Sequence, residues 1–201
     1  MLAIAGGKGG SGKTTTTLGL ARAIEDRTLA VDADADLPNL HALAGVPRDP
    51  PPGGDPGHPD PTTPRGETYV APAVRAPPDG VGCRLRRLAG YEGTVLVDCP
   101  AGAGPDATVP LRVADAVLLV ATPCIAALRD AAKTAAMARA VGTPVAGAVL
   151  TQARLTPPGA DDLLGCPVLA TVPPAADPLA DPAVGRSYDR LARALADRQK
   201  A

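Results

Sequence analysis

The sequence predicts an α/β protein whose doubly wound, mostly parallel sheet carries helices on both faces. Short apolar runs alternate along the chain with segments of helical spacing, which is the pattern of repeated strand–helix units. The runs are continuous rather than alternating, as expected of strands that are covered on both faces. A glycine-rich loop joins the first run to the first helical segment. At 201 residues the chain suits a single domain, residues 1–201.

The expected strands are apolar runs that end at glycine, proline or acidic residues. The run at Thr28–Val31 ends in aspartates and the run at Thr94–Val97 ends in Asp-Cys-Pro, whereas Glu67–Val74 alternates only weakly. In chain order the expected strands are Leu2–Ala5, Thr28–Val31, Glu67–Val74, Thr94–Val97, Ala116–Ala121, Pro144–Leu150 and Pro167–Thr171.

The expected helices are segments in which apolar residues recur every three or four positions. The clearest one carries Ile125, Leu128 and Ala132 on one face and is closed by Gly142. In chain order the expected helices are Thr14–Ile24, Asn39–Ala44, Arg84–Leu88, Ile125–Ala140 and Ser187–Ala196. Proline and glycine dominate residues 47–66. We predict an exposed, flexible loop there, because a proline-dense segment can neither complete backbone ladders nor bury much apolar area.

The glycine-rich loop has the spacing G-x-x-x-x-G-K-[ST], which is typical of a site for nucleotide phosphates. Its glycines let successive backbone N–H groups turn toward phosphate oxygens, its second lysine supplies a cation for the β and γ phosphates, and its threonine hydroxyl can ligate Mg²⁺. The helix that follows adds unpaired N–H groups and a positive dipole end. The predicted nucleotide-binding residues are Gly7, Lys8, Gly9, Gly10, Ser11, Gly12, Lys13, Thr14 and Thr15.

Carboxylates follow two of the expected strands. Asp32 and Asp34 come after the second strand, and Asp98 comes after the strand at 94–97. In a parallel sheet these strand ends meet at the edge that carries the glycine loop. Carboxylates there can hold Mg²⁺ through water or orient a water in line with the γ-phosphate. Asp36 is expected instead to cap the helix that begins near Asn39.

Composition and charge argue against several other classes of protein. The formal net charge of −1 gives no signal for nucleic acid or an acidic membrane, and the absence of Phe and Trp disfavours base stacking. No apolar run reaches the roughly 20 residues that span a bilayer, and the loop lies too close to Met1 for a signal peptide, so we expect a cytoplasmic protein. The cysteines form no C-x-x-C pair and are expected to be buried thiols: Cys83, Cys99, Cys124 and Cys166.

Around these residues the chain resembles the MinD/ParA family of P-loop ATPases. Residues 8–15 are similar to the family's deviant Walker A motif, with Ser11 where valine or isoleucine is commoner. Residues 31–34 and 97–102 are similar to its two switches. Residues 114–130 resemble the strand and helix after the second switch, and Val172-Pro173 matches the usual turn near the nucleotide base, which makes Pro173 a further nucleotide-binding candidate.

The resemblance implies an ATP-dependent homodimer. In the family, the lysine matching Lys8 reaches across the interface to the partner's ATP, where a second cation neutralises charge on the transferred phosphoryl group. The lysine matching Lys13 grips the β and γ phosphates, and the threonine matching Thr14 ligates Mg²⁺.

The resemblance also assigns roles to the aspartates and implies a function. The aspartate matching Asp34 orients the attacking water, while those matching Asp32 and Asp98 hold the water shell of the metal. The implied activity is ATP hydrolysis that acts as a switch in the positioning or partitioning of cellular cargo, together with an unidentified activator or cargo protein.

Some departures from the family leave alternatives open. Thr151-Gln152 stands where the family often has Asn-Arg, and the proline-rich segment is short. The C-terminal helix lacks the bulky apolar face of a membrane anchor, which favours packing on the sheet. The alternatives are an ATPase for cofactor or metal-cluster assembly, a non-hydrolysing nucleotide-binding regulator, and a small-molecule ligase, for which no substrate residues are evident.

Overall fold

Eight strands form one sheet in the computed structural model of the protein, which describes residues 1–7, 9–63, 67–74, 78–102 and 104–199. The strands are β1 (Leu2–Ala5), β2 (Thr28–Asp32), β3 (His58–Pro59), β4 (Thr68–Ala71), β5 (Thr94–Asp98), β6 (Ala116–Ala121), β7 (Val145–Thr151) and β8 (Val168–Val172). Their order is β3-β4-β2-β5-β1-β6-β7-β8, and only the β3–β4 pair is antiparallel among these strands. The predicted doubly wound, mostly parallel sheet is confirmed.

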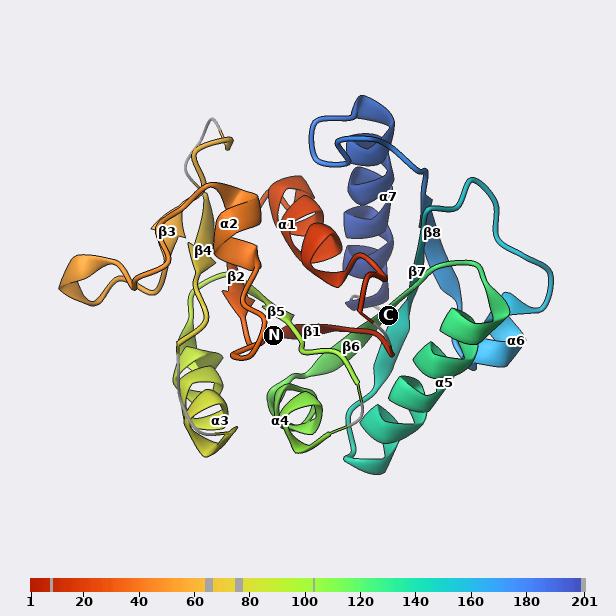
Figure 1. Ribbon diagram of the computed structural model, residues 1–201, viewed down its shortest axis with the longest axis horizontal. Coiled ribbons are helices and arrows are strands. Elements are labelled where there is room, and N and C mark those ends of the chain that lie inside the picture. The colour runs from red at the N-terminus through yellow and green to blue at the C-terminus, as the bar shows by residue number, and fades with distance from the viewer. Residues whose placement is uncertain (8, 64–66, 75–77, 103, 200–201) are drawn as a thin grey trace.

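Helices cover both faces of the sheet (Figure 1). One face carries α1 (Lys13–Ala23), α2 (Leu40–Ala44) and α7 (Pro182–Gln199). The other carries α3 (Pro78–Arg87), α4 (Pro105–Val113), α5 (Ile125–Ala140) and α6 (Ala160–Leu164). Two short 3₁₀ helices occupy Pro52–Gly54 and Leu88–Gly90. None of the described helices combines the length and the hydropathy needed to span a membrane.

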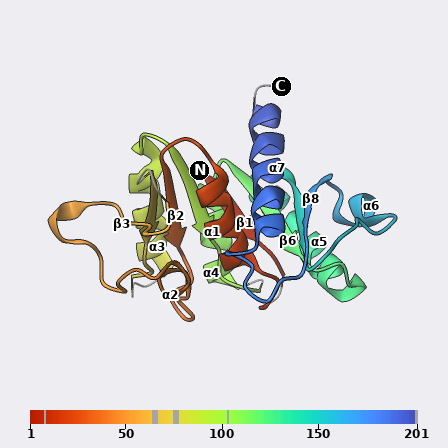
Figure 2. The same cartoon turned by 90° about the horizontal axis from the view of Figure 1, so that it is seen from above.

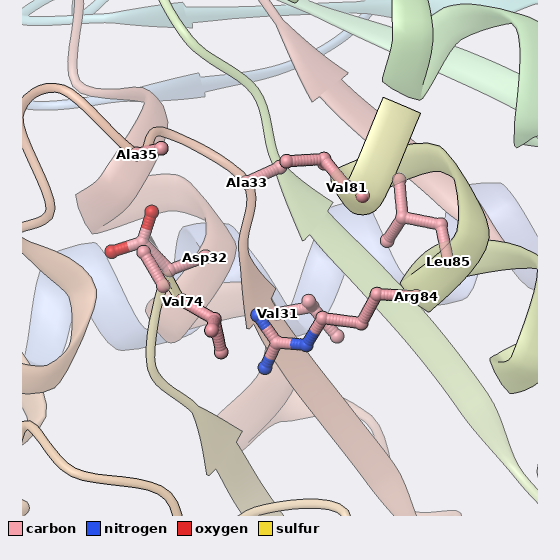
Figure 3. Close-up of a pocket in the computed structure, with 10 residues that line it drawn as sticks. Val31, Asp32, Ala33, Ala35, Val74, Val81, Arg84 and Leu85 are labelled. Carbon is pink, nitrogen blue, oxygen red and sulfur yellow. The ribbon is translucent and has the colours of Figure 1, made fainter. Parts of the chain in front are cut away.

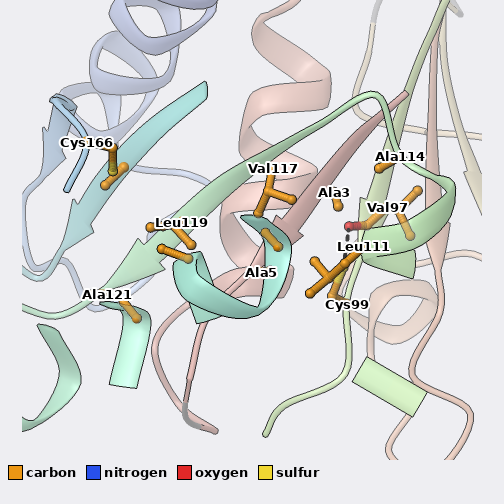
Figure 4. Packing of buried hydrophobic residues seen from close by; sticks show 14 of the residues in the cluster. Ala3, Ala5, Val97, Cys99, Leu111, Ala114, Val117, Leu119, Ala121 and Cys166 are labelled. Carbon is orange, nitrogen blue, oxygen red and sulfur yellow. Dashed lines mark hydrogen bonds between the residues drawn. The ribbon is translucent and has the colours of Figure 1, made fainter. Parts of the chain in front are cut away.

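Alternate strand residues build two separate apolar cores, one under each helical layer. In β1, Ala3 and Ala5 pack toward α4 and α5, whereas Ile4 packs toward α1 and α7. Figure 4 shows the first core, in which small and branched aliphatic side chains such as Val117 and Leu119 fill the layer. Burial of both strand faces explains why the strands read as continuous apolar runs in the sequence.

The last helix belongs to the fold. Val184, Tyr188, Leu191 and Leu195 of α7 are buried against the sheet and α1. The ring of Tyr188 lies where a Cβ at Gly19 would come within 2.2 Å of it, so α1 and α7 approach closely at this glycine. The apolar stripe of α7 is therefore used for packing, as expected.

Helices α4 and α6 were not predicted, for different reasons. Pro105 begins α4 and Pro110 lies inside it, where a proline breaks one helical hydrogen bond, although Ala114 N–H still donates to the Pro110 carbonyl at 3.0 Å. Helix α6 is a single short turn bounded by Gly159 and Gly165, both in the left-handed conformation. Prolines therefore conceal α4 in the sequence, whereas α6 is too short to show a helical period.

Part of the segment predicted to be a flexible loop is paired and anchored. His58 and Pro59 form β3, which pairs with β4. Asp60 is buried and accepts hydrogen bonds from Arg22 of α1, with Nε at 2.8 Å and Nη2 at 3.3 Å. Thr62 donates both its N–H and its hydroxyl to the same carboxylate. This carboxylate ties the end of the proline-rich segment to α1.

The prediction for the cysteines is wrong for two of the four. Cys99 and Cys166 are buried, and burial raises the pKa of both thiols. Cys83 on α3 and Cys124 before α5 are exposed. Both exposed cysteines lie on or next to a helix, where the apolar spacing of the neighbours did not reveal which face they occupy.

Candidate functional site

The glycine loop runs from β1 to the first residue of α1 and depends on glycine in two ways. Gly10 and Gly12 have φ of 78° and 86°, in the left-handed region where larger residues are strained. Gly7 instead lies against α5, where an added Cβ would come within 2.3 Å of the Asp130 Cβ. Conformation at two positions and close packing at a third therefore exclude larger side chains. Gly9 is exposed, with open space around it.

The neighbouring strand end holds the loop in place. Thr151, the last residue of β7, donates its hydroxyl to the Ser11 carbonyl at 2.7 Å. A Cβ at Gly12 would lie 3.2 Å from the Thr151 methyl carbon. The Ser11 hydroxyl is itself buried and has no hydrogen-bond partner within the described part of the chain. A buried hydroxyl of this kind beside a glycine turn is suited to meet a phosphate oxygen.

The first turn of α1 contacts the end of β5. Lys13 is only 8% exposed although it carries a charge. The Thr14 side chain lies beside Asp98 and lowers the pKa of that carboxyl, and the Thr17 hydroxyl lies 3.4 Å from Asp98 Oδ1 and 3.0 Å from the Lys13 carbonyl. The structure thus brings together Lys13, Thr14 and Asp98, three of the predicted site residues. Thr15 lies half-buried in the same turn.

Asp32 and Asp98 lie side by side at the carboxyl ends of adjacent strands. They are partners in the β2–β5 register and are 1% and 3% exposed. Burial, joined by the negative charge of Asp32, raises the pKa of Asp98 to about 7, while Lys13 and the Thr14 and Thr17 hydroxyls oppose the shift. Burial also raises the pKa of Asp32, against N–H groups that favour its charged form. Two carboxylates placed this way gain from a nearby cation.

The oxygen donors at this strand edge fit Mg²⁺. Thr14, Asp32 and Asp98 supply hard oxygen ligands next to a lysine and a glycine turn. The described residues contain no group of three or more His, Cys, Asp or Glu side chains that could hold a metal by themselves. That donor set suits Mg²⁺, which keeps several waters and takes other ligands from a phosphate.

Asp34 lies beside this pair but faces a different space. Its N–H donates to Asp32 Oδ1 at 3.0 Å, and its own Oδ1 accepts from Leu37 N–H at 3.0 Å. The side chain lines a cavity of about 120 Å³ with Pro100 and Asp106, between the loops after β2 and β5. The cavity lies at the carboxyl edge of the sheet, where the sequence predicts the attacking water.

The prediction that Asp36 caps the helix after the first switch is wrong. Leu40, the first residue of α2, donates its N–H to Asp32 Oδ2 at 3.2 Å. Asn39 occupies the cap position without a side-chain bond. Asp32 therefore organises both the loop and the helix that follow it, because its carboxylate accepts N–H groups from each.

Two further strand ends flank the glycine loop. Beyond Thr151, Gln152 has φ of 53°, and it is the one non-glycine residue with positive φ among those described. Ala153 N–H then donates to the Val172 carbonyl at 2.9 Å, so the turn before Pro173 lies beside this kink. Lys8, predicted to act across a dimer interface, lies outside the described residues.

Arg84 was not identified from the sequence. Figure 3 shows its side chain extending from α3 toward Val31 and Val74, in a small cavity of about 10 Å³ that Asp32 also lines. Burial lowers the pKa of Arg84, and the charge of Asp32 opposes that shift. The sequence predicted a short helix from this residue, but no local signal could show that its cation reaches the first switch.

Comparison with known proteins decides the family. Residues 2–177 match the model of the CobQ/CobB/MinD/ParA nucleotide binding domain. The chain belongs to this family. An uncharacterized ATP-binding protein of Methanocaldococcus jannaschii is 29% identical to this chain over 193 residues. The alignment covers 86% of this chain and 73% of that protein.

Solved structures agree with this membership. The cell division ATPase MinD of Pyrococcus furiosus superposes with a TM-score of 0.85 at 27% identity, and the alignment covers 98% of both chains. The septum site-determining protein MinD of Pyrococcus horikoshii, complexed with Mg-ADP, superposes with a TM-score of 0.82 at 26% identity over 95% of this chain and 93% of that one. The predicted family is therefore confirmed, and family membership supports nucleotide binding.

Proposed function

We propose that this chain is a MinD/ParA-like ATPase that binds ATP with Mg²⁺, dimerises through Lys8 and hydrolyses ATP as a switch for positioning or partitioning cellular cargo. The observation that carries the proposal is the junction of Lys13 and Thr14 with the buried Asp32–Asp98 pair at one strand edge. Two desolvated carboxylates beside a phosphate loop are suited to a metal-bound nucleotide, and they are costly without one.

Each residue of the junction has a role in this proposal. Lys13 binds the β and γ phosphates, and the backbone of the glycine loop donates N–H groups to them. Thr14 would ligate Mg²⁺ directly, with Asp32 and Asp98 holding its waters; when bound, the metal neutralises phosphate charge. Asp34, which lines the adjoining cavity, orients the attacking water.

Exposed apolar side chains support a dimer that meets at the same edge. Leu37, Val74, Ile125 and Leu155 follow the carboxyl ends of β2, β4, β6 and β7, and Leu155 is 82% exposed. Large apolar residues left in water around a binding site are typical of an interaction surface. A second copy that closes over the nucleotide would cover them and bring its Lys8 to the first copy's ATP.

ATP turnover in three variants tests the proposal. Lys13→Ala is expected to abolish nucleotide binding, Asp34→Ala to retain binding with turnover reduced at least about a hundredfold, and Lys133→Ala, an exposed lysine of α5, to leave both unchanged. Binding is measured with a fluorescent ATP analogue, and turnover is measured as phosphate release. Binding without turnover in the unsubstituted protein, with candidate partners present, would point instead to a non-hydrolysing regulator.

A further inference from the structure

A second concave site lies at the amino edge of the sheet, opposite the glycine loop. A groove of about 830 Å³ is enclosed by the end of α1, the first residues of β1, β5 and β6, and the outer half of α7. Figure 2 shows this half of α7 projecting past the neighbouring end of α1. The size falls in the range of binding pockets, and no residue of the nucleotide site lines the groove.

The bottom of the groove is apolar. Leu2, Ile24 and Ala192 are half-buried and line it, while Leu96 and Leu195 close it beneath them. These side chains belong to, or pack against, the core between the sheet and α7. The groove therefore extends an apolar core to solvent, and covering it would remove further apolar surface from water.

Carboxylates outnumber cations around the groove, whose charged lining residues are Glu25, Asp26, Asp115, Asp189, Arg193 and the terminal ammonium of Met1. Glu25 and Asp26 follow α1, Asp189 lies on α7, and none of the three forms an ion pair within 4 Å among the described residues. The fourth carboxylate, Asp115, is paired with the terminal ammonium of Met1 at 2.7 Å. The C-terminal end of α1, where the helix dipole is negative, points to the same place. An apolar base with this excess of carboxylates favours a cationic, amphipathic occupant.

We propose that the groove docks a short, basic amphipathic helix of a partner protein. The wall supplied by α7 runs from Asp189 to Ala196, which is about 10 Å of helix at 1.5 Å per residue. A docked helix of about two turns has that length. Aliphatic residues of such a helix cover Leu2 and Ile24, and its Lys or Arg side chains pair with Glu25 and Asp189.

This surface is independent of the proposed ATPase function. The groove and the nucleotide site lie at opposite ends of strands such as β1 and β5, whose four or five residues span about 13–17 Å. Nucleotide and partner helix therefore do not compete for space. The helix α1 begins at the phosphate loop and ends at the groove, so one rigid element contacts both sites.

A designed peptide tests the proposal without knowledge of the partner. The probe is a fluorescein-labelled Leu/Lys peptide of about four helical turns, with leucines at i, i+3, i+4 and i+7. Its binding is followed by anisotropy, and its site is mapped by amide chemical shifts of the labelled protein. We expect saturable binding, with shifts confined to the groove residues, and at least about tenfold weaker binding of the same peptide with Glu in place of Lys.

Matched charge reversals distinguish binding at the groove from nonspecific electrostatic attraction to the protein surface. Glu25→Lys/Asp189→Lys is expected to weaken binding about tenfold or more, while Asp55→Lys/Asp162→Lys, an exposed pair outside the groove with the same change in net charge, changes it less than about twofold. Both are exposed substitutions, and circular dichroism checks that each variant is folded. No binding of the Lys peptide, shifts elsewhere, or equal losses in both double variants would overturn the proposal, whatever the outcome of the ATPase tests.

Discussion

Removing the charge of Asp98 is expected to stabilise the nucleotide-free protein and to abolish its response to Mg²⁺. Asp98 is buried beside Asp32, and its pKa is raised to about 7 from an ordinary value of 3.8. The Asp98→Asn substitution keeps the shape of the side chain, and the new amide oxygen can still accept a hydrogen bond from Thr17, whose hydroxyl lies 3.4 Å from Oδ1. The substitution removes the buried negative charge and replaces one acceptor oxygen with an NH2 donor.

The sign and size of the effect follow from the raised pKa. Between about pH 4 and pH 7 the folded protein binds a proton at Asp98 that the unfolded chain has released, so stability falls as the pH rises through this window. The loss is up to about 1.4 kcal/mol per pH unit, which gives roughly 4 kcal/mol as an upper limit above pH 7. We expect Asp98→Asn to gain about 2–4 kcal/mol at pH 8 and almost nothing at pH 4.

Thermal unfolding at several pH values measures this difference. For a chain of this size the gain corresponds to a rise in Tm of roughly 4–16 °C at pH 8 without metal. Added Mg-ATP is then expected to raise the Tm of the unsubstituted protein but not that of the variant. A variant that is less stable than the unsubstituted protein at pH 8 would refute the assignment of Asp98 as a buried carboxylate that binds the hydrated metal ion. A variant that Mg-ATP stabilises as much as it stabilises the unsubstituted protein would refute it as well.

The remaining predictions concern packing. Gly19→Ala places a Cβ within 2.2 Å of the buried Tyr188 ring and is expected to cost about 1–3 kcal/mol of unfolding free energy. Gly185→Ala in α7 meets nothing within 4 Å and is expected to gain up to about 1 kcal/mol. Chemical denaturation measures both variants, and equal effects on the unfolding free energy would contradict the prediction. Asp60→Ala leaves the Arg22 guanidinium without its buried partner and is expected to lower the free energy of unfolding by about 3–5 kcal/mol. Proteolysis of the segment before β4 is expected to become faster. An unchanged denaturation midpoint would show that this ion pair contributes little to stability.

Much of the fold could be predicted because burial of the strands leaves a strong signal. The sheet is covered on both faces, so each strand of the centre appears as an apolar run, and the polar residue that ends it marks the carboxyl edge. Asp32 and Asp98 were found in this way, and they are direct partners in the sheet register. The position of Lys13 and Thr14 followed from the loop pattern, because the glycine turn must be followed by a helix.

What could not be predicted depends on contacts between distant segments. Arg84 reaches the first switch from α3, and nothing near it in the sequence shows where its cation lies. Asp32, and not the predicted Asp36, caps the helix α2, because its carboxylate at the end of β2 accepts the N–H of Leu40 eight residues later. The anchoring of Asp60 by Arg22 likewise joins a proline-rich segment to a helix 38 residues away.

We propose that a second copy of the chain completes the nucleotide site. Asp34→Ala is expected to bind ATP and to slow hydrolysis, so that an ATP-bound dimer accumulates, and Lys8→Ala in the same background is expected to bind ATP as a monomer. Light scattering coupled to size-exclusion chromatography in Mg-ATP measures the molar mass of both variants. We expect about 40 kDa for Asp34→Ala and about 20 kDa for the double variant, from a chain mass of 20.0 kDa. A monomer in Asp34→Ala despite bound ATP, or a dimer of unchanged strength without Lys8, would contradict the proposal.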